Sequence, residues 1–438
     1  MASRTDAPGS ASGSTSSGSP SSTASNEGRR SPLTPSDVRG AAQLATEATL
    51  QTTRLVETVH ARVRAALVRT PPREVTRTGG LTGWIYRAIR LITRLAGRAT
   101  VGASQVAEHV TRHAPPPETK TRQRLLSIVN GVLGDHLSDS GNPLARSFSL
   151  RDANGQPLNG PPRNARASMG DTVIVFVHGL CLSDRAWWAS PDTRGHVEAI
   201  AAATGGVPVF ARYNTGRHIG GNGQLFSRHV EALARRERPS RIILVAHSMG
   251  GLVVRSAFRH ARQTAARWPS RVTETVYLGT PHQGAPLERA GAWIEEQLRR
   301  TAFTAPFTAL TSLRSRGIQD LRYGTLAADD APSSPVSRAS GPHPAAGRAL
   351  YVAATRSSEP SAGQKIGDGL VPLASALHTT DAPPGTRRVF ENLGHLELLH
   401  APAVTAYLCD WLSAPAPSSG DCDPPLLTET APPPESPV

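Results

Sequence analysis

From Thr172 onward, the hydrophobic positions along the chain follow two alternating patterns. Short continuous apolar runs are separated by stretches in which apolar residues recur every three or four positions. Continuous runs are typical of strands covered on both faces, and the wider spacing is typical of helices. The pattern predicts an α/β fold, with a mostly parallel central sheet flanked by helices. The predicted strands are Val173–Val177, Val207–Tyr213, Ile242–Ala246, Thr275–Leu278, Leu350–Ala354 and Arg388–Glu391.

Three helices are predicted ahead of the sheet. The first begins at Ser36 and keeps a helical spacing of apolar residues until Pro71. The second follows Gly80, and the third covers Arg122–Leu137. Together they predict a helical N-terminal extension over residues 36–145.

The second helix is amphipathic around Trp84–Leu95, with isoleucines on one side and arginines on another. Two placements fit such a helix. It can dock on the sheet domain with its arginines in solvent, which we favour. Alternatively it lies on an anionic membrane surface with Trp84 and Tyr86 at the interface, which would be a peripheral membrane contact.

Low-complexity composition marks both ends of the chain and one insertion. Residues 1–35 are rich in Ser and Gly, residues 414–438 are rich in Pro, and both segments are predicted to be disordered. The sheet domain is predicted over residues 146–413. Residues 285–349 interrupt the alternation of strand and helix patterns in this domain. The segment has a helical first half and a Ser/Pro/Ala-rich second half, and it is predicted to be a lid insertion.

The formal net charge is +14, which raises the question of a nucleic-acid or anionic partner. The basic residues are almost all Arg, with only Lys120 and Lys365 as lysines, so we attribute the bias to a GC-rich genome. The arginines are dispersed and no recognition motif is present, and we therefore expect no nucleic-acid partner.

Cys181, Cys409 and Cys422 are too few and too irregularly spaced for a disulfide framework or a zinc site. We expect free thiols, with a bridge between the last two as the alternative. The first residues lack the apolar core of a signal peptide, and no run reaches the ~20 apolar residues of a membrane span. We expect a cytoplasmic protein, with peripheral membrane association as the alternative, and the sequence does not predict its oligomeric state.

Ser248 lies where a buried strand turns directly into a helix. The strand ends in Ala246-His247-Ser248-Met249-Gly250-Gly251, and an apolar helical pattern follows. Such a turn holds the serine in a strained backbone conformation and therefore requires small residues two positions before and after it. Ala246 and Gly250 meet this requirement, so the pattern predicts that Ser248 is the nucleophile of a nucleophile elbow.

A serine nucleophile needs a general base, and the base needs an orienting carboxylate. Asp368 lies in a Gly-Asp-Gly turn after the fifth predicted strand, and its alternative interpretation is an ordinary turn residue. Asp320 and Asp410 are weaker candidates because they lie within helical patterns. His395 follows the last strand, whereas its competitor His400 lies at the start of a helix. We predict Asp368 as the acid and His395 as the base.

Backbone N–H groups must hold the oxyanion that forms during acyl transfer. The first strand ends at His178-Gly179-Leu180, and the glycine lets the chain turn there. We predict that the N–H groups of Leu180 and Met249 form the oxyanion hole. His178, Gly179 and Gly250 are predicted to support the site.

The segments around these residues resemble a known family. The chain is similar to bacterial lipases and esterases of the α/β-hydrolase superfamily, particularly to the GPI inositol-deacylase-like hydrolase domain family. The resemblance covers Asp171–Leu412 and implies the α/β-hydrolase fold, ester hydrolysis and the absence of a metal or other cofactor. Ala246 stands where glycine is usual. The segments are FVHGL at 176–180, AHSMGG at 246–251, LGTPHQGAPLE at 278–288, GDGLVP at 367–372 and GHLELL at 394–399.

These observations predict a serine carboxylic-ester hydrolase, a lipase or esterase, that works through an acyl-enzyme. The predicted partner is a hydrophobic ester or acyl-lipid substrate. An acyltransferase or a thioesterase would use the same triad. A non-catalytic, membrane-associated scaffold with a hydrolase fold is the alternative from a different class.

Overall fold

A computed structural model describes most of the chain. The predicted N-terminal tail up to residue 32, most of the predicted lid and Cys422 lie outside the described residues. The described ranges are 33–67, 80–110, 119–158, 170–188, 190–286, 315–326, 347–357, 367–378, 386–415 and 427–430.

A twisted eight-stranded sheet forms the centre of the described structure, with the order β1-β3-β2-β4-β5-β6-β7-β8. Only β1 runs antiparallel to its neighbour, so the predicted mostly parallel sheet is confirmed. The strands are β1 (Ser149–Arg151), β2 (Thr172–Val177), β3 (Val207–Arg212), β4 (Arg241–His247), β5 (Val272–Leu278), β6 (Arg348–Thr355), β7 (Thr386–Glu391) and β8 (Leu427–Thr430).

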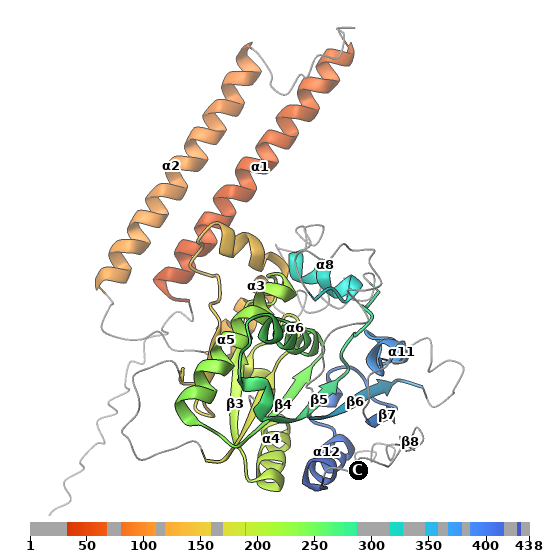
Figure 1. The fold of residues 1–438 in the computed structure, drawn as a ribbon. Coiled ribbons are helices and arrows are strands. Elements are labelled where there is room, and N and C mark those ends of the chain that lie inside the picture. The colour runs from red at the N-terminus through yellow and green to blue at the C-terminus, as the bar shows by residue number, and fades with distance from the viewer. Residues whose placement is uncertain are drawn as a thin grey trace, which may run out of the picture.

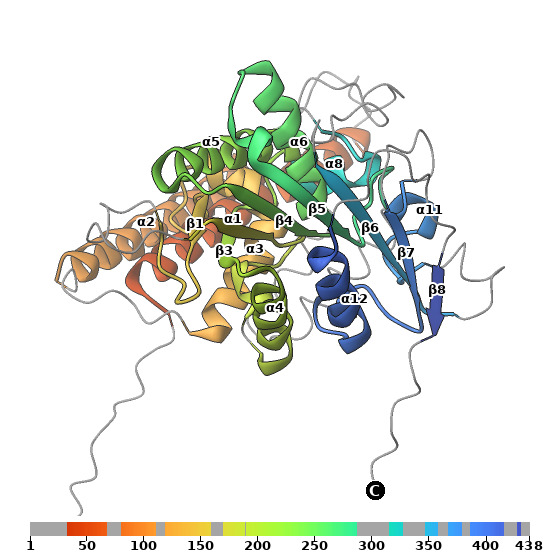
Figure 2. The ribbon, with the colours of Figure 1, turned by 60° about the horizontal axis from the view of Figure 1, so that its bottom comes forward.

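Helices cover both faces of the sheet, and each face has its own core (Figure 2). Helices α5 (Ile219–Glu237) and α6 (Met249–Gln263) pack on one face, while α4 (Pro191–Thr204) and α12 (Pro402–Ser413) pack on the other. In β2, Val173, Val175 and Val177 enter the first core, and Ile174 and Phe176 enter the second. This two-sided burial explains why the strands are continuously apolar in the sequence.

Short elements connect the larger ones. They are η1 (Asp184–Trp187), η2 (Trp268–Arg271), α8 (Arg316–Tyr323), α11 (Leu373–Ala376) and η4 (Glu397–Leu399). All of them except η2, which leads into β5, follow the carboxyl end of a strand. Of the predicted lid insertion, the structure describes residues 285–286, residues 315–326 with α8, and the start of β6.

Strand β1 is not among the six predicted strands, and neither is β8. Strand β8 lies within 414–438, for which we expected disorder, and pairs in parallel with β7 from Arg388↔Leu427 to Glu391↔Thr430. The prediction was wrong for these four residues. The free edge of β7 supplies the backbone partners, and such pairing places little demand on side chains.

Helix α3 (Lys120–Asp139) belongs to the body of the molecule, not to a separate extension. Its residues Ile128, Val132 and Leu137 are buried in the same core as β2. The core shared with the sheet therefore includes part of the predicted N-terminal extension. Helical spacing shows which face of α3 is apolar, but it does not show which neighbour covers that face.

Helices α1 (Pro35–Leu67) and α2 (Gly80–Val110) form a long hairpin that projects from the body (Figure 1). The base of α1 is tied to the body, where Asn142 Nδ2 donates to the carbonyl of Gly40 at 3.1 Å and Arg122 pairs with Asp37. Helix α2 packs on α1, which corrects the expectation that its Trp84–Leu95 segment docks on the sheet domain. None of the described helices combines the length and apolar character needed to cross a bilayer.

Candidate active site

Ser248 lies in the turn between β4 and α6 and has a strained backbone. Its φ and ψ angles are 55° and −128°, and such a conformation costs a non-glycine residue roughly 1–3 kcal/mol. The turn is held by the N–H of Ser248, which donates to the carbonyl of Leu278 at 2.8 Å. A Cβ on Gly250 would lie 2.7 Å from the carbonyl oxygens of Val177 and His178, so only glycine fits there.

Asp368 and His395 form a buried hydrogen-bonded pair. His395 Nδ1 donates to Asp368 Oδ2 at 2.6 Å, and the His395 backbone N–H donates to the Asp368 carbonyl at 3.1 Å. The other carboxylate oxygen, Oδ1, accepts from the N–H groups of Leu370 and Val371. The carboxylate is therefore fixed on both oxygens, and His395 Nε2 remains available at the pocket.

The charge state of Asp368 follows from these contacts. Burial acts to raise the pKa of its carboxyl, but the charge and hydrogen bond of His395 and the two backbone donors outweigh it, so the net pKa is lowered. An ionised carboxylate accepts hydrogen bonds only, and the proton of the shared bond therefore lies on His395 Nδ1. This tautomer leaves the lone pair on Nε2, as a general base requires.

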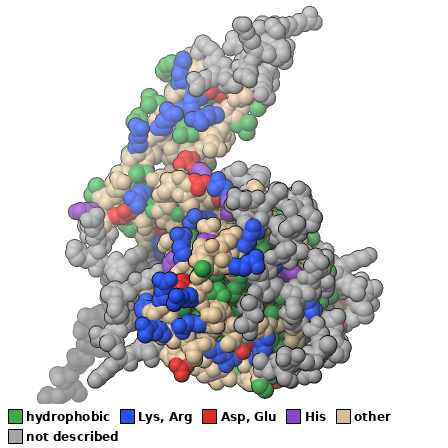
Figure 3. Space-filling view, viewed as in Figure 1, with side chains coloured by type: hydrophobic (Ala, Val, Ile, Leu, Met, Phe, Trp, Pro, Cys, Tyr) green, Lys and Arg blue, Asp and Glu red, His purple; other side chains and the backbone are tan. Residues whose placement is uncertain are grey.

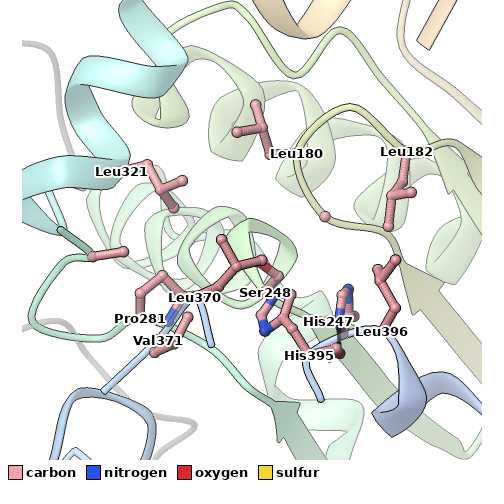
Figure 4. A pocket seen from close by; sticks show the side chains of 12 residues that line it. Leu180, Leu182, His247, Ser248, Pro281, Leu321, Leu370, Val371, His395 and Leu396 are labelled. Atoms are coloured by element: carbon pink, nitrogen blue, oxygen red, sulfur yellow. Dashed lines mark hydrogen bonds between the residues drawn. The ribbon is translucent and has the colours of Figure 1, made fainter. Parts of the chain in front are cut away.

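Ser248 and His395 line the same pocket and lie side by side in Figure 4. Within the described residues no hydrogen bond joins their side chains. A serine–base hydrogen bond is often long before substrate binds, and it tightens in the reacting complex. The structure thus brings the three predicted triad residues to one end of the sheet, at the carboxyl ends of β4, β6 and β7.

Gly279 is a site residue that sequence reasoning missed. It follows β5 with φ of +57°, and a Cβ there would lie 3.2 Å from both Asp368 Oδ2 and His395 Cε1 and 2.9 Å from Leu398. The acid–base pair therefore occupies space that a side chain at position 279 would need. The sequence signal was a glycine directly after a strand, within the quoted segment 278–288.

His247 is the second residue that sequence reasoning left without a role. Its Nε2 donates to the backbone carbonyl of His395 at 3.0 Å, and the two rings lie 4.7 Å apart. Burial and the charge of His395 lower the pKa of His247 to about 3, so it stays neutral. It is a positioning residue that holds the backbone on which His395 stands.

The backbone N–H groups of Leu180 and Met249 make no hydrogen bond within the described residues. Met249 is the first residue of α6, so its N–H points outward at the positive end of the helix. Cys181 has φ of 56°, and its N–H donates to Thr215 Oγ1 at 3.2 Å, which fixes the turn after Leu180. Both predicted donors are free for an oxyanion.

His178 is buried away from the reacting groups. Its ring stacks on Tyr213 at 4.3 Å, and Tyr213 donates from its hydroxyl to the His178 carbonyl at 2.5 Å. Burial lowers the pKa of His178 to about 4, so it is neutral. Next to it, a Cβ on Gly179 would lie 2.9 Å from the Cβ of Ser248. These contacts fit the predicted supporting roles of His178 and Gly179.

The pocket above Ser248 is apolar and opens to solvent, with a cavity volume of about 20 Å³. Leu321 of α8 is part of its wall, so a described piece of the predicted lid insertion lies against the site (Figure 4). Its other hydrophobic lining residues are Leu180, Leu182, Pro281, Ala285, Leu370, Val371 and Leu396.

The competing acid and base candidates lie elsewhere. His400 and Asp410 are exposed. Asp320 accepts from the N–H of Ile219 at 2.8 Å and from His218, and so ties α8 to the start of α5. Neither Asp320 nor Asp410 touches His395.

Among the described residues, no group of three or more histidine, cysteine or acidic side chains is arranged to hold a metal ion. Cys181 and Cys409 are free thiols, and burial raises the pKa of both. The predicted free state of these two thiols is confirmed.

Residues 223–329 match the model of the PGAP1-like alpha/beta domain family, which confirms the predicted resemblance over this segment. The segment contains β4, the Ser248 turn, α6 and β5. No curated protein sequence matches the chain.

Several solved structures are similar at low identity. A mature lipase from Bacillus licheniformis is 18% identical with a TM-score of 0.41, covering 61% of this chain and 98% of its own. A 2-hydroxy-6-oxo-6-phenylhexa-2,4-dienoate hydrolase from Rhodococcus is 14% identical with a TM-score of 0.35, and the match covers 56% of this chain and 91% of that enzyme. A thermophilic esterase from Thermogutta terrifontis is 14% identical with a TM-score of 0.32, and the match covers 61% of this chain and 92% of that esterase.

Proposed function

We propose that this protein is a serine hydrolase that cleaves carboxylic esters with hydrophobic acyl groups. The observation that carries the proposal is the buried 2.6 Å contact between His395 Nδ1 and Asp368 Oδ2, in the pocket that also contains the strained Ser248. An imidazole held by an ionised carboxylate beside a serine is the arrangement that activates a hydroxyl nucleophile.

In the proposed reaction, the Ser248 hydroxyl attacks the ester carbonyl and His395 Nε2 takes its proton. The N–H groups of Leu180 and Met249 hold the negative oxygen of the tetrahedral intermediate. His395 then gives the proton to the leaving alcohol, which departs as the acyl-enzyme forms. A water molecule, deprotonated by His395, attacks the acyl-enzyme, and Ser248 recovers its proton as the acid leaves.

The lining of the pocket supports a hydrophobic acyl group. Leucine, valine, proline and alanine side chains surround Ser248, and the wall includes Leu321 from the predicted lid insertion. Burying an acyl chain against such a wall is favourable by about 0.8 kcal/mol per CH₂ group. A thioester or an alcohol acceptor would use the same residues, so thioesterase and acyltransferase activities are tested together with hydrolysis.

Labelling with a fluorophosphonate probe tests the nucleophile directly. We expect covalent modification of wild-type protein, mapped to the Ser248 peptide by mass spectrometry. The Ser256→Ala variant is a suitable control because Ser256 is a buried serine of α6 whose hydroxyl donates to the Leu326 carbonyl. Absence of labelling at Ser248 in folded protein would overturn the proposal and favour a scaffold role.

A series of p-nitrophenyl esters tests the substrate class. We expect kcat/KM to rise from acetyl to longer acyl chains until the pocket is filled. Hydrolysis of acyl-thioesters at a higher kcat/KM would assign the thioesterase activity instead. Transfer of the acyl group to an added alcohol in preference to water would assign the acyltransferase.

A further inference from the structure

The two helices of the hairpin meet through small and polar residues. Among the side chains that the structure describes in the outer half of α1, Thr53, Glu57 and Ala61 are buried. On α2, Arg90 pairs with Glu57, and a Cβ on Gly97 would lie 2.3 Å from Thr46 Oγ1. The contact between the helices therefore uses close approach and an ion pair, with few large apolar side chains.

The large apolar residues of α2 lie on the other side of the helix, in solvent. At 3.6 residues per turn, they occupy about half of the helix circumference, opposite Arg90 and Gly97. Each of these side chains is between 40 and 66% exposed. They are Trp84, Ile85, Ile89, Leu91, Ile92, Leu95 and Val106.

Helix α1 carries a smaller apolar group of its own, Leu55, Val56 and Val59, which is also exposed and faces away from α2. An amphipathic helix in a soluble domain normally turns its apolar stripe towards the core. Here both helices turn it away from their shared contact. An exposed apolar surface of this extent marks an interaction site.

The charges around the apolar stripe are basic. Arg87, Arg94 and Arg98 lie along one border of the stripe on α2, and all three are exposed. Figure 3 shows Lys and Arg side chains beside hydrophobic ones on the outer part of the hairpin. Residues 48–98 contain ten arginines and two glutamates, and one of these glutamates, Glu57, is already paired with Arg90.

We propose that the hairpin binds the surface of an anionic lipid bilayer. Helix α2 lies in the plane of the interface, with its apolar stripe at the boundary of headgroups and acyl chains. Arg87, Arg94 and Arg98 contact lipid phosphates, and Trp84 lies at the depth that tryptophan prefers. The proposal goes beyond ester hydrolysis and does not depend on it.

Charge favours this occupant over a second copy of the chain. Two hairpins that joined through their apolar stripes would bring the bordering arginines of both copies together, and like charges in contact oppose association. An anionic membrane offers the opposite charge and a flat apolar layer. The four arginines within α2 also oppose insertion across the bilayer, in agreement with the lack of a membrane-spanning helix among the described residues.

Vesicle flotation with the full-length protein tests the proposal. We expect binding to vesicles of phosphatidylcholine with about 30% phosphatidylglycerol, and at least about tenfold weaker binding to pure phosphatidylcholine. Raising the salt to about 0.5 M should weaken the binding, since the Debye length is then well below ~8 Å. Equal binding to both vesicle types, or no binding to either, would overturn the proposal.

Two variants of α2 distinguish the contribution of the apolar stripe to vesicle binding from the contribution of charge. Ile92→Glu with Leu95→Glu should reduce binding to the anionic vesicles by at least about tenfold, because both side chains lie in the stripe. Gln105→Glu is the control, because it adds a negative charge at an exposed position of α2 near the body and should change binding less than about threefold. Equal losses in both variants would overturn the role of the stripe.

Two further readouts keep the outcomes distinct. Hydrolysis of a short soluble ester and the circular dichroism spectrum should be the same in all variants, so a failure of folding or of the proposed chemistry is seen separately. Light scattering without lipid should give the same mass for the wild type and for the Ile92→Glu, Leu95→Glu variant. A wild-type dimer that this variant abolishes would assign the surface to a second copy and overturn the proposal.

Discussion

The active-site region and the α1–α2 hairpin use hydrophobic residues in opposite ways. Around the sheet, Phe176 and Val175 are fully buried, and the polar groups that surround Ser248 are held by backbone and side-chain partners. In the hairpin, Ile92 and Leu95 are exposed, while Glu57 is buried between the helices. The apolar residues of the body are covered by other parts of the chain, whereas several of those of the hairpin form a surface that is exposed to solvent.

The two regions are therefore stabilised to different degrees by the burial of apolar side chains. In the body, burial of apolar strands fixes the sheet, and the sheet fixes the loops that carry Asp368 and His395. In the hairpin, α1 and α2 meet largely through small and polar residues, so burial of apolar surface stabilises these helices less. Changes in the body should therefore alter catalysis and global stability, and changes in the hairpin should leave both nearly intact.

The largest effect is expected for Ser248→Ala. Removing the nucleophile of a triad lowers kcat by roughly 10⁴–10⁶-fold, because the remaining groups cannot act without it. Steady-state hydrolysis of p-nitrophenyl butyrate measures the loss, and vesicle flotation should be unchanged. Activity within about tenfold of wild type would remove Ser248 from the mechanism.

Asp368→Asn should lower kcat/KM by roughly 10³–10⁴-fold, because an amide no longer selects the His395 tautomer with a free Nε2. Asp320→Asn is the matched control, since that carboxylate contacts Ile219 and His218 and not His395. Its kcat/KM should stay within about threefold of wild type while thermal stability falls. The reverse ranking would show that the acid was assigned to the wrong residue.

Acid should destabilise the body more than the hairpin. Burial lowers the pKa of His178 and His196 to about 4 and that of His247 to about 3, whereas an unfolded chain titrates near pH 6.5. The unfolded state thus binds more protons below about pH 6.5, and each histidine lowers the free energy of unfolding by up to about 1.4 kcal/mol per pH unit towards the folded pKa.

Urea unfolding and amide exchange from about pH 7 to about pH 5 would measure this loss. Exchange should accelerate in β2, β4 and α4, which carry or adjoin these histidines, and should change less in α1 and α2. His109, near the end of α2, is exposed. A loss of protection confined to the hairpin would contradict the assignment of these groups.

Gly279→Ala tests whether the arrangement of Asp368 and His395 requires the absence of a side chain at position 279. The new methyl group would press on Asp368, His395 and Leu398, and we expect kcat/KM to fall by about 10²-fold. Gly205→Ala is matched to it, because Gly205 has φ of +62° but open space around its Cα. Both variants should lose about 1 kcal/mol of stability, and only the first should lose activity.

The smallest effect is expected for Glu57→Gln in the hairpin. Weakening its buried pair with Arg90 should destabilise the contact between α1 and α2 by about 1 kcal/mol and accelerate amide exchange in both helices. Glu47→Gln is the control, since its partner His136 is half exposed. Neither variant should change kcat/KM, and a loss of activity in Glu57→Gln would show that the hairpin and the site are coupled.

Much of the sheet and of the site could be predicted from local sequence. Six strands were placed to within a few residues, because continuous apolar runs report burial on both faces. Ser248 could be found because a nucleophile elbow requires small residues at fixed spacing. Strand β8 could not be predicted, because its partner is the backbone of β7 and its own side chains give little signal.

The roles of Gly279 and His247 depend on contacts between segments far apart in the chain. Gly279 is constrained by Asp368 and His395, which lie beyond β6. His247 is fixed by the carbonyl of His395, 148 positions later. Neither contact leaves a periodic pattern in the sequence, so the roles of both residues could not be predicted from local spacing.

The sequence alone determined the α/β fold class, the position of the Ser248 turn and the order of the candidate acid and base, because each follows from local spacing and local backbone requirements. Only the tertiary structure decided that α3 joins the core, that Asp368 and not Asp320 meets His395, and that the apolar face of α2 points away from α1. These facts depend on which surfaces meet, and amphipathic spacing shows that a face is apolar without showing what will cover it.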